Sequence, residues 1–550
     1  MATVYCICLD GAPPTLLSRF ARDGTMPNLG RIMDRSSWSR AIPSLPTVTS
    51  VNWTTMVSGL HCGSHGRPFS DRQLRYFWEA AEEAGLPVGI ANIEHNQIGG
   101  NTFFIGHPRL LSDPLHLNLS DEDSSEAEIE GPQGEKLAEI ACSCGDPLEV
   151  RIEAETGASL RLDPNRFSDF VSFRSMGEEG TEVCTRFRFD AESRSLYVSP
   201  LRTTSGFAQP TEIEERILDI AGYPPVKGFP LYHKGKADLE TSVEEEAHHA
   251  KWFAEIAVGM MGGYDEGLWF HRHNTTDGIG HMYLGLVDTD SARYDEGNID
   301  QHWRDLRMWY GTVDTLLGTI LDGDPDARFA MCTDHGHIGY GRLVSIPRLL
   351  VDAGLSKPAE AHPAILDRAR SRVTLSNDEI FVNRDLLGPG DSEYEELRTR
   401  IIEALRGLVD PANGRHVVSL AIRREHAQAM QFWGKERGDV LYELDPGYFT
   451  LDGLIADEIF QQLPIPNSSV HHGWLPGFES EVGSNYSFML FSGHPGGERD
   501  IDAEGAPHLV DFAPSVLHML GLGAPWLQGR ALTEMLEPRD DGNTKEREGQ

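Results

Sequence analysis

Seven residues that could do chemistry together are spread over most of the 550-residue chain. Most of them follow short apolar segments typical of buried strands, and strand ends in an α/β sheet gather at one edge. Carboxylate oxygens and imidazole nitrogens without a thiolate suit a pair of hard or borderline divalent cations. Two such ions beside a hydroxyl nucleophile suit displacement at phosphorus. The seven residues are Asp10, Thr49, Asp277, His281, Asp334, His335 and His472.

Thr49 is the candidate nucleophile. Residues 52–57 are predicted to form a short helix that ends at Gly59, with Thr49 near its amino end. Unpaired backbone N–H groups at such an end favour negative charge, which suits both an alkoxide and an incoming phosphate. A threonine there also acts as a helix cap, and Thr47 and Ser50 offer rival hydroxyls. The segment alone therefore leaves the nucleophile open.

The candidate ligands fall into three local patterns. Asp277 and His281 are four residues apart, so a helical turn points both side chains to one side. Asp334 and His335 directly follow a predicted buried strand, and Asp10 stands in an Asp-Gly turn of a kind common at strand ends. Each pattern is weak alone. Their joint occurrence in this order is what predicts a metal centre.

Other histidines compete for a place in this centre. His471 is an alternative to its neighbour as the last ligand, and His337 is a candidate for the edge of the site. His271 and His273 alternate along a predicted strand, where core packing is favoured over a role behind the ligands. His248–His249 lies in a polar helical segment and is predicted to be solvated.

Composition narrows the class of partner. The formal net charge of −37 opposes binding to nucleic acid polymers and anionic membranes, which need clustered Lys and Arg. An anionic substrate would then need local positive charge, which bound cations supply. Seven cysteines without CxxC spacing argue against a disulfide framework or a zinc ribbon, and core packing explains Cys6, Cys8 and Cys332 best. The chain enters a strand without a basic leader, and no stretch has the apolar length of a membrane span, so we expect a cytoplasmic protein.

The order of predicted elements indicates an α/β core with two insertions. Apolar runs at 3–9, 88–92, 268–273, 328–333 and 486–492 alternate with helical patterns, which predicts a mostly parallel central sheet flanked by helices. The acidic, Ser-rich stretch 120–128 is predicted to be a linker or exposed loop. The predicted parts are 1–118, 209–370 and 456–536 for the core, 119–208 for a β-rich insertion, 371–455 for an α+β cap-like insertion and 537–550 for a disordered tail.

Taken together, these motifs resemble the alkaline phosphatase superfamily, and within it the type I phosphodiesterase/nucleotide pyrophosphatase family. Leu9-Asp10-Gly11 is similar to the first metal aspartate of that family, and Thr49-Ser-Val-Asn-Trp-Thr is similar to its nucleophile helix. The resemblance extends over nearly the whole chain. Its further motifs are Asp277-x-x-x-His281, Thr333-Asp334-His335-Gly336, His472-Gly473, the closing helix 511–521 and Gly529-Arg530.

The resemblance implies an alkaline-phosphatase-like fold and hydrolysis of a small anionic phosphate ester, at a phosphodiester or pyrophosphate bond that can be nucleotide-like. Thr49 would attack phosphorus and form a phosphothreonine, and Asn52 would donate to a non-bridging oxygen. Two divalent ions are implied, with Zn²⁺ as the first choice and Mn²⁺ or iron as alternatives. Their implied ligands are Asp10, Thr49, Asp334 and His335 for one ion, and Asp277, His281 and His472 for the other.

Other functions remain open on the same residues. Ser50-Val51 departs from the family, which usually has proline or an aromatic residue after the nucleophile, so the substrate pocket is the least defined part. A phosphomonoesterase or phosphonate hydrolase would fit the scaffold, with Arg67, Arg72 or Lys234 as candidates for extra positive charge. From a different class, the chain would be an inactive module that binds metal or nucleotide. The oligomeric state is undetermined, with a homodimer as one option.

Overall fold

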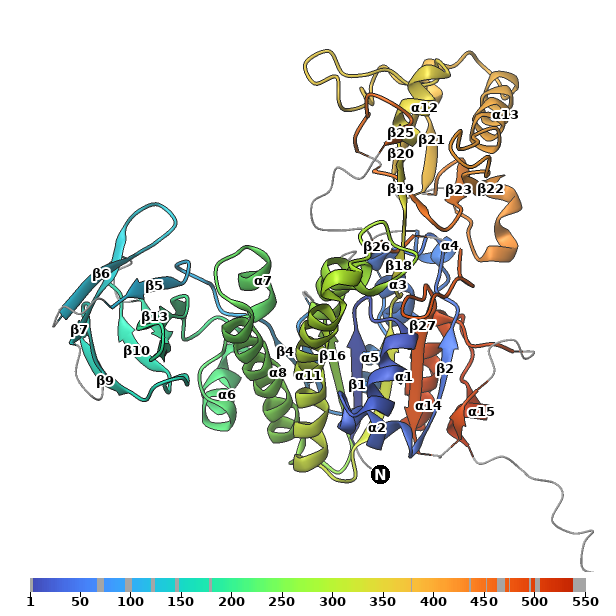
Figure 1. Cartoon of the computed structure of the whole chain (residues 1–550). Helices are drawn as coiled ribbons and strands as arrows, with labels where there is room; N and C mark the ends of the chain where they lie inside the picture. The colour runs from blue at the N-terminus through green and yellow to red at the C-terminus, as the bar shows by residue number, and fades with distance from the viewer. Residues whose placement is uncertain are drawn as a thin grey trace, which may run out of the picture. The chain divides into compact units, whose positions relative to one another are not determined.

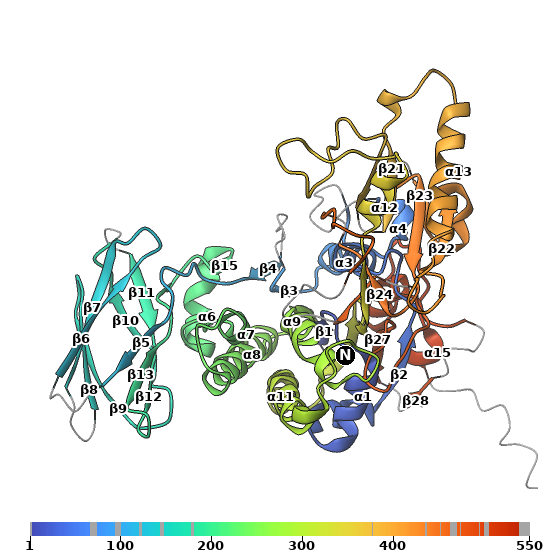
Figure 2. The ribbon, with the colours of Figure 1, turned by 45° about the horizontal axis from the view of Figure 1, so that its top comes forward.

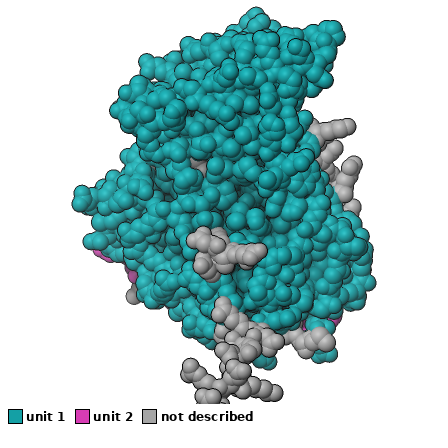
Figure 3. Space-filling view, turned by 90° about the vertical axis from the view of Figure 1, so that its right-hand side faces the viewer, with its two compact units in different colours: residues 1–88, 265–314, 326–550 teal, residues 89–264, 315–325 magenta. Residues whose placement is uncertain are grey.

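The computed structural model describes residues 3–66, 74–93, 101–119, 124–143, 148–177, 181–376, 378–434, 437–451, 453–461, 470–473, 475–493, 496–499 and 505–537. The chain divides into two compact units. Unit 1 comprises residues 1–88, 265–314 and 326–550, and unit 2 comprises residues 89–264 and 315–325. Figure 1 shows the elements of the chain, and Figure 3 shows one face of unit 1 in teal.

Six consecutive strands of the central sheet belong to unit 1, in the order β16-β1-β17-β27-β2-β28. Strand β1 pairs in parallel with β16 and β17, whereas β27 pairs antiparallel with β17 and β2. All six residues of β1 are buried, as in a strand covered on both faces. The α/β class and the parallel centre of the sheet are therefore confirmed. The bounds are β16 Leu268–His273, β1 Val4–Leu9, β17 Arg328–Thr333, β27 Ser487–Ser492, β2 Ser36–Ala41 and β28 Gly497–Glu498.

Helices flank this sheet (Figure 1). Helix α14 packs on both α3 and β1, and α11 buries Leu306, Trp309 and Val313, three residues of its predicted apolar face. Asp314 of α11 accepts a hydrogen bond from the backbone N–H of Leu29 at 2.9 Å, which fixes α11 to the first turn of α2. The bounds are α1 Pro14–Asp23, α2 Pro27–Met33, α3 Thr49–Ser58, α4 Cys62–His65, α5 Trp78–Glu83, α9 Thr275–Ile279, α11 Ile299–Gly323 and α14 Phe512–Met519.

A second sheet of unit 1, which we call the cap sheet, has four antiparallel strands in the order β20-β21-β23-β22. One face of β23 points Val440 and Tyr442 into a hydrophobic core shared with α13. On the other face, Leu441 joins a small cluster with Val51 and Cys62 of the main fold. Both faces of the cap sheet are thus covered. The bounds are β20 Val373–Ser376, β21 Glu379–Val382, β22 Val418–Arg423, β23 Val440–Leu444, α12 Ile346–Asp352 and α13 Ser392–Arg406.

Unit 2 is rich in strands and has its own hydrophobic core, in which Ile140, Ile152 and Phe187 are buried. Its largest sheet is antiparallel, with strands in the order β6-β7-β8-β9, and two three-stranded sheets lie beside it (Figure 2). The four strands are β6 Ser124–Glu130, β7 Lys136–Ser143, β8 Leu148–Glu153 and β9 Ala158–Leu162, and the helices are α6 Glu214–Ala221, α7 Gly228–His233 and α8 Leu239–Met261.

The structure differs from the sequence predictions at two places in unit 2. Residues 124–128, predicted to be part of a linker or exposed loop, belong to β6, because their alternating side chains find a partner strand in β7. His249, predicted to be solvated, is buried and stacks on His107 with ring centroids 5.1 Å apart. The predicted disordered tail falls, apart from Glu537, outside the described residues.

Two further expectations concern the cysteines and membrane-spanning helices. The described cysteines, Cys6, Cys8 and Cys332 among them, are all buried, as core packing predicts. Within the described part of the chain, no helix combines the length and the apolar character needed to cross a membrane.

Candidate metal centre

Strand register places three acidic residues at one edge of the sheet in unit 1. The last residues of β1, β16 and β17 are aligned with one another across the sheet. Asp10 and Asp334 directly follow β1 and β17, and Asp277 lies in α9, which begins just beyond β16. Because neighbouring parallel strands end together, residues separated by hundreds of positions in sequence meet here.

Thr49 is the first residue of α3, which ends at Gly59 as predicted. Its Oγ1 lies 3.0 Å from His335 Nε2, so this hydroxyl contacts one of the predicted ligands. The rival residue Thr47 contributes its backbone instead, since its carbonyl accepts a hydrogen bond from His472 Nδ1 at 3.0 Å. The structure thus brings the Thr49 hydroxyl to a predicted ligand.

The side-chain amide of Asn52 is hydrogen-bonded to backbone groups of the segment before α3. Its Oδ1 accepts a hydrogen bond from the backbone N–H of Ser44 at 2.7 Å, and its Nδ2 donates to the carbonyls of Ser44 and Val48, both at 3.2 Å. The side chain is fully buried. Asn52 holds the segment that leads into Thr49 through these bonds, and its expected role as a donor to substrate stays a prediction.

Asp10, Asp334 and His335 form a first, fully buried group of ligand atoms. His335 Nε2 lies 3.2 Å from Asp334 Oδ2 and 3.9 Å from Asp10 Oδ1. The other oxygen of Asp334 accepts backbone N–H groups of Gly11 and His335, both at 3.0 Å, which fixes the carboxylate. His335 Nδ1 donates to the Gly336 carbonyl at 3.1 Å, so its Nε2 faces the group.

Two residues that the sequence reasoning did not single out as ligand supports hold Asp10. Arg272 Nη2 donates to Asp10 Oδ2 at 2.6 Å, and Trp53 Nε1 donates to the same oxygen at 3.1 Å. The guanidinium of Arg272 also lies 4.6 Å from the Trp53 ring centroid, a cation–π contact. Arg272 lies in the same strand as His271 and His273, between the two histidines that the sequence pattern had singled out. Its position in this alternating strand is the one sequence feature that could have indicated its contact with Asp10.

Asp277, His281, His337 and His472 form a second group whose ligand atoms lie within 4.8 Å of one another. Asp277 Oδ1 is 3.5 Å from His281 Nε2, as the four-residue spacing predicts, and 3.2 Å from His337 Nε2. His281 lies in a π-turn over Gly280–Leu284, a backbone feature that is frequent at functional sites. His281 Nδ1 donates to the Val470 carbonyl at 3.0 Å, which leaves Nε2 toward Asp277.

The structure distinguishes between the neighbouring histidines His471 and His472 as candidate ligands. His472 contributes a ring nitrogen to the second group, whereas His471 does not. The His471 ring stacks on Phe449 at 4.0 Å between centroids, and its Nδ1 donates to the carbonyl of His472 at 2.8 Å. The geometry therefore favours His472 as the last ligand.

The electrostatics of the two groups differ. Burial, with the charge of Asp277 added, raises the pKa of Asp10 to about 6, and burial with the charge of Asp10 raises the pKa of Asp334 well above its ordinary value. Burial lowers the pKa of His335 to about 3, so its imidazole is neutral. Burial acts to raise the pKa of Asp277, but His337 and the other nearby imidazoles lower it well below its ordinary value.

These residues fit divalent cations. Asp10 Oδ1, Asp334 Oδ2, Asp277 Oδ1 and His337 Nε2 are buried and make no hydrogen bond within the described part of the chain. Each faces another acceptor atom at 3.2–3.9 Å, an arrangement that is unfavourable unless a positive charge lies between them. The donor atoms are oxygen and imidazole nitrogen without sulfur, a set that suits Zn²⁺, Mn²⁺ or iron.

The cap sheet reaches the helices that follow Thr49. Arg437 Nη2 donates to the carbonyl of Cys62 in α4 at 3.2 Å, and the N–H of Gly63 donates to the carbonyl of Gln431 at 3.0 Å. The sequence predicted a cap-like insertion but gave no sign of this contact, which depends on segments more than 360 residues apart.

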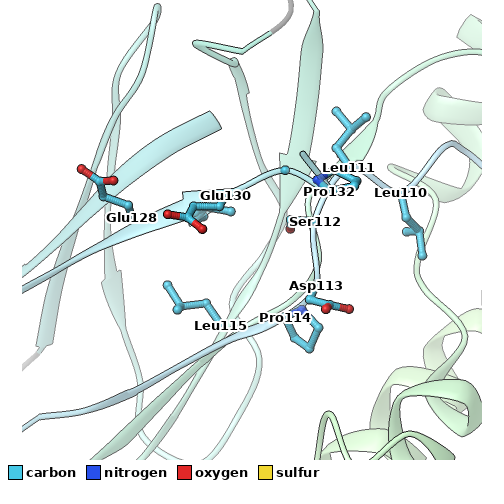
Figure 4. Close-up of a pocket in the computed structure, with 11 residues that line it drawn as sticks. Leu110, Leu111, Ser112, Asp113, Pro114, Leu115, Glu128, Glu130 and Pro132 are labelled. Atoms are coloured by element: carbon cyan, nitrogen blue, oxygen red, sulfur yellow. The ribbon is translucent and has the colours of Figure 1, made fainter. Parts of the chain in front are cut away.

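A separate concave surface lies in unit 2, with a volume of about 550 Å³ (Figure 4). It is lined by residues 110–115 and 128–132, which include three carboxylates and no imidazole. Two of the carboxylates are already paired, Asp113 with Lys236 and Glu128 with Lys136. This surface therefore lacks the donor set of the strand-edge groups.

Residues 4–68 match the model of a known protein family, the type I phosphodiesterase / nucleotide pyrophosphatase family. This stretch contains Asp10, Thr49 and α3. The match confirms in this part of the chain the resemblance on which the assignment of Asp10 and Thr49 depends. No curated protein sequence matches the chain.

Solved structures with similar folds cover nearly the whole chain. Alkaline phosphatase PafA is 12% identical, with 97% of this chain and 99% of PafA covered and a TM-score of 0.51. Murine ectonucleotide pyrophosphatase/phosphodiesterase 5 is 12% identical over 98% of this chain and 100% of its own, with a TM-score of 0.45. Phosphonoacetate hydrolase from Sinorhizobium meliloti is 12% identical over 93% and 94%, with a TM-score of 0.43.

The likeness to PafA shows that the chain has the alkaline phosphatase fold, which the sequence predicted. At this identity it shows the fold alone. The family match supplies the sequence relationship, and it covers the part of the chain that carries β1 and α3. The chain therefore has the alkaline phosphatase fold, and its residues 4–68 match the model of the type I phosphodiesterase / nucleotide pyrophosphatase family.

Proposed function

We propose that the chain is a metal-dependent hydrolase of small phosphate esters, which cleaves a phosphodiester or pyrophosphate bond with Thr49 as its nucleophile. The observation that carries this proposal is the 3.0 Å contact between Thr49 Oγ1 and His335 Nε2, at the strand edge where the buried acids meet. The family match over residues 4–68 supports the type of bond, including a nucleotide-like substrate.

The two groups of ligand atoms define where divalent ions would be held. The first group would include Thr49, and Asp277 of the second group also lies close to Asp10 and His335 of the first, so the two ions would be held side by side. When bound, such ions lower the pKa of a nearby hydroxyl and neutralise charge on the reacting phosphate. The proposed ligands are Asp10, Thr49, Asp334 and His335 for one ion, and Asp277, His281 and His472 for the other.

The reaction consists of two displacements at phosphorus. The Thr49 hydroxyl gives its proton to water and its oxygen forms a bond to phosphorus while the bond to the leaving-group oxygen breaks, and that oxygen takes up a proton from water, so the protons balance. Water then attacks the phosphothreonine, and cleavage of the Thr49 oxygen–phosphorus bond restores the hydroxyl. The unpaired N–H groups in the first turn of α3 favour the charge of the phosphate beside Thr49.

Residues behind the ligands keep the nucleophile and the acids in place. Asn52 fixes the segment from Ser44 to Val48, which sets the position of the first residue of α3. Arg272 and Trp53 hold one oxygen of Asp10, so that the other oxygen faces His335. Arg67, Arg72 and Lys234 were the candidates for the extra positive charge that a monoester substrate needs. Arg67 and Arg72 lie outside the described residues, and Lys234 belongs to unit 2.

The proposal is tested with an aryl phosphodiester and the matching monoester. The metal-reconstituted wild type is compared with Thr49→Ala, with Thr49→Ser, and with Ser50→Ala as the neighbouring-hydroxyl control. We expect a preference for the diester and a loss of about 10³-fold or more in kcat for Thr49→Ala, because removal of a nucleophile abolishes the covalent route. Thr49→Ser should retain part of the activity, and Ser50→Ala most of it.

The other outcomes separate the alternatives. A preference for the monoester moves the chain to the phosphomonoesterase reading. Full activity in Thr49→Ala contradicts the nucleophile. Inactivity on both esters, in a protein that has bound two ions per chain, contradicts the phosphodiesterase proposal and favours a binding module.

A further inference from the structure

We propose that His337 is a fourth protein ligand of the ion held by Asp277, His281 and His472. This inference rests on the metal centre of the proposed function. It changes that centre, because the family resemblance supplies three ligands for this ion. His337 is fully buried, and its Nε2 lies 3.2 Å from Asp277 Oδ1.

Two glycines leave a slot for the His337 ring. A Cβ atom at Gly11 would lie 2.5 Å from His337 Cε1, and a Cβ atom at Gly280 would lie 2.8 Å from His337 Nδ1. Neither distance is possible for a real side chain, so any larger residue at either position would displace the ring. Gly11 and Gly280 adjoin the proposed ligands Asp10 and His281, so the slot is built from the motifs of the metal centre.

The hydrogen bonds of His337 leave its Nε2 as an unused acceptor. Its Nδ1 donates to the carbonyl of Gly11 at 2.6 Å, so Nε2 is the ring nitrogen that can offer a lone pair to a metal ion. That lone pair faces the carboxylate of Asp277, and neither atom makes a hydrogen bond within the described part of the chain. A cation between the two acceptors removes this repulsion.

His337 shares this arrangement with the two histidines already proposed as ligands. His281 and His472 also donate from Nδ1 to a backbone carbonyl, each at 3.0 Å, and both contribute ring nitrogens to the same group. Metal-binding histidines characteristically donate their second ring N–H to a carbonyl or carboxylate, which fixes the tautomer and the ring orientation. His471 makes a similar bond, yet it contributes no atom to the group.

The proposal makes the two ion sites chemically unequal. The second site would contain one carboxylate and three imidazoles, whereas the first contains two carboxylates, one imidazole and the threonine hydroxyl. Imidazole favours Zn²⁺ and iron, and oxygen ligands suit Mn²⁺ better. The ion beside His337 should therefore be the more tightly held of the two.

The test uses full-length protein and reports metal binding, so it does not depend on turnover. Cobalt-substituted protein is examined for exchangeable imidazole N–H protons that are shifted by the bound ion. Wild type should show four, from His281, His335, His337 and His472. If wild type shows three such protons and His337→Gln shows the same three, the proposal is overturned. The wild-type count itself can be made whether or not the variant folds.

Chelator competition measures the affinity. His337→Gln should weaken the tighter ion by about 100-fold or more, because loss of a residue that only supports a ligand costs about 10–100-fold. His472→Gln is the positive control, and His471→Gln is the matched control that should leave affinity unchanged. Equal affinity in wild type and His337→Gln overturns the proposal alone, whereas failure of wild type to bind two ions overturns the metal centre of the proposed function as well.

Discussion

The cap sheet of unit 1 and the β6-β7-β8-β9 sheet of unit 2 both consist of four antiparallel strands. They differ in what covers their faces. The cap sheet buries Val440 and Tyr442 on one face and Leu441 on the other, where Leu441 joins Val51 of α3 and Cys62 of α4. In unit 2, strand β8 alternates strictly between buried and exposed residues, as in a sheet with one solvated face.

This difference predicts how each region affects function. A perturbation of the cap sheet is transmitted to α3 and α4 through packed side chains, so stability and activity should change together. A perturbation inside unit 2 acts on a hydrophobic core made of residues of that unit. It should change stability with little effect on the chemistry. Matched variants in the two regions test this directly.

The largest expected effect comes from buried ion pairs. Arg437 Nη1 lies 2.9 Å from Glu379 Oε1 with both side chains buried, and Arg437 also binds the carbonyl of Cys62. Arg437→Met should cost about 3–5 kcal/mol in the free energy of unfolding, because Glu379 loses its partner in a buried place. The kcat/KM of the metal-loaded enzyme should fall as well, since a contact with α4 is lost.

Its counterpart in unit 2 is the buried pair of Arg186 and Glu245. Arg186→Met should cost a similar free energy in urea unfolding and leave the kcat/KM of the folded enzyme unchanged. An equal fall of kcat/KM in both variants would contradict the contrast between the two regions.

The next effect comes from two glycines in close contact with side chains. A Cβ at Gly63 would lie 2.3 Å from the Trp433 ring, and a Cβ at Gly177 would lie 2.5 Å from Leu137 Cδ2. Overpacking of this kind costs about 1–3 kcal/mol. The loss of stability in Gly63→Ala should lie near the upper end of this range, because the indole of Trp433 is rigid. Activity should fall as well, because this ring links the segment before β23 to α4. Gly177→Ala should lie near the lower end, because a leucine methyl can rotate away. Thermal unfolding and kinetics on both variants decide between these outcomes.

The pH dependence of stability should have opposite signs in the two regions. Burial, with the charges of Asp378 and Glu379, raises the pKa of Glu443 in the cap sheet well above 4.5, so its stabilising contribution falls as pH rises above about 4.5. Burial and the nearby Arg186 and Arg202 lower the pKa of partly buried His248 to about 3, so stability in unit 2 falls as pH drops below 6.5.

Each of these groups contributes at most about 1.4 kcal/mol per pH unit within its window. Hydrogen exchange read separately on peptides from β23 and α8 at pH 5 and pH 8 measures both slopes. Glu443→Gln should reduce the pH dependence of stability in β23 alone, and His248→Gln should reduce it in α8 alone. Parallel slopes in the two regions would refute the opposite signs.

The smallest expected effect comes from helix caps. Ser345 accepts the N–H of Arg348 at 3.2 Å at the start of α12, and Asp238 accepts the N–H of Thr241 at 2.7 Å at the start of α8. Ser345→Ala and Asp238→Ala should each cost about 1 kcal/mol, with the closer bond of Asp238 giving the larger loss. Neither should alter kcat, because neither residue contacts α3 or a ligand. Denaturant melts with parallel assays check both points, and a change in kcat for either variant would show coupling that the packing does not indicate.

Local patterns predicted the parts of the fold that depend on local physics. The apolar runs at 268–273 and 328–333 coincide with β16 and β17, because a strand covered on both faces needs a continuous apolar segment. The helix ending at Gly59 also formed as predicted. Residues 124–128 were wrongly predicted to be part of a linker or exposed loop, because their acidic composition obscures an alternating pattern that forms a strand only when β7 pairs with it.

The sequence by itself determined the α/β class and the set of acids and histidines that follow the core strands. The tertiary structure decided which of them meet, and it added Arg272 and the ring slot of His337 while turning Asn52 toward backbone. The bond from His337 to Gly11 joins residues 326 positions apart. No local pattern encodes such a contact, because it exists only when β1 and β17 end in register and bring the two segments together.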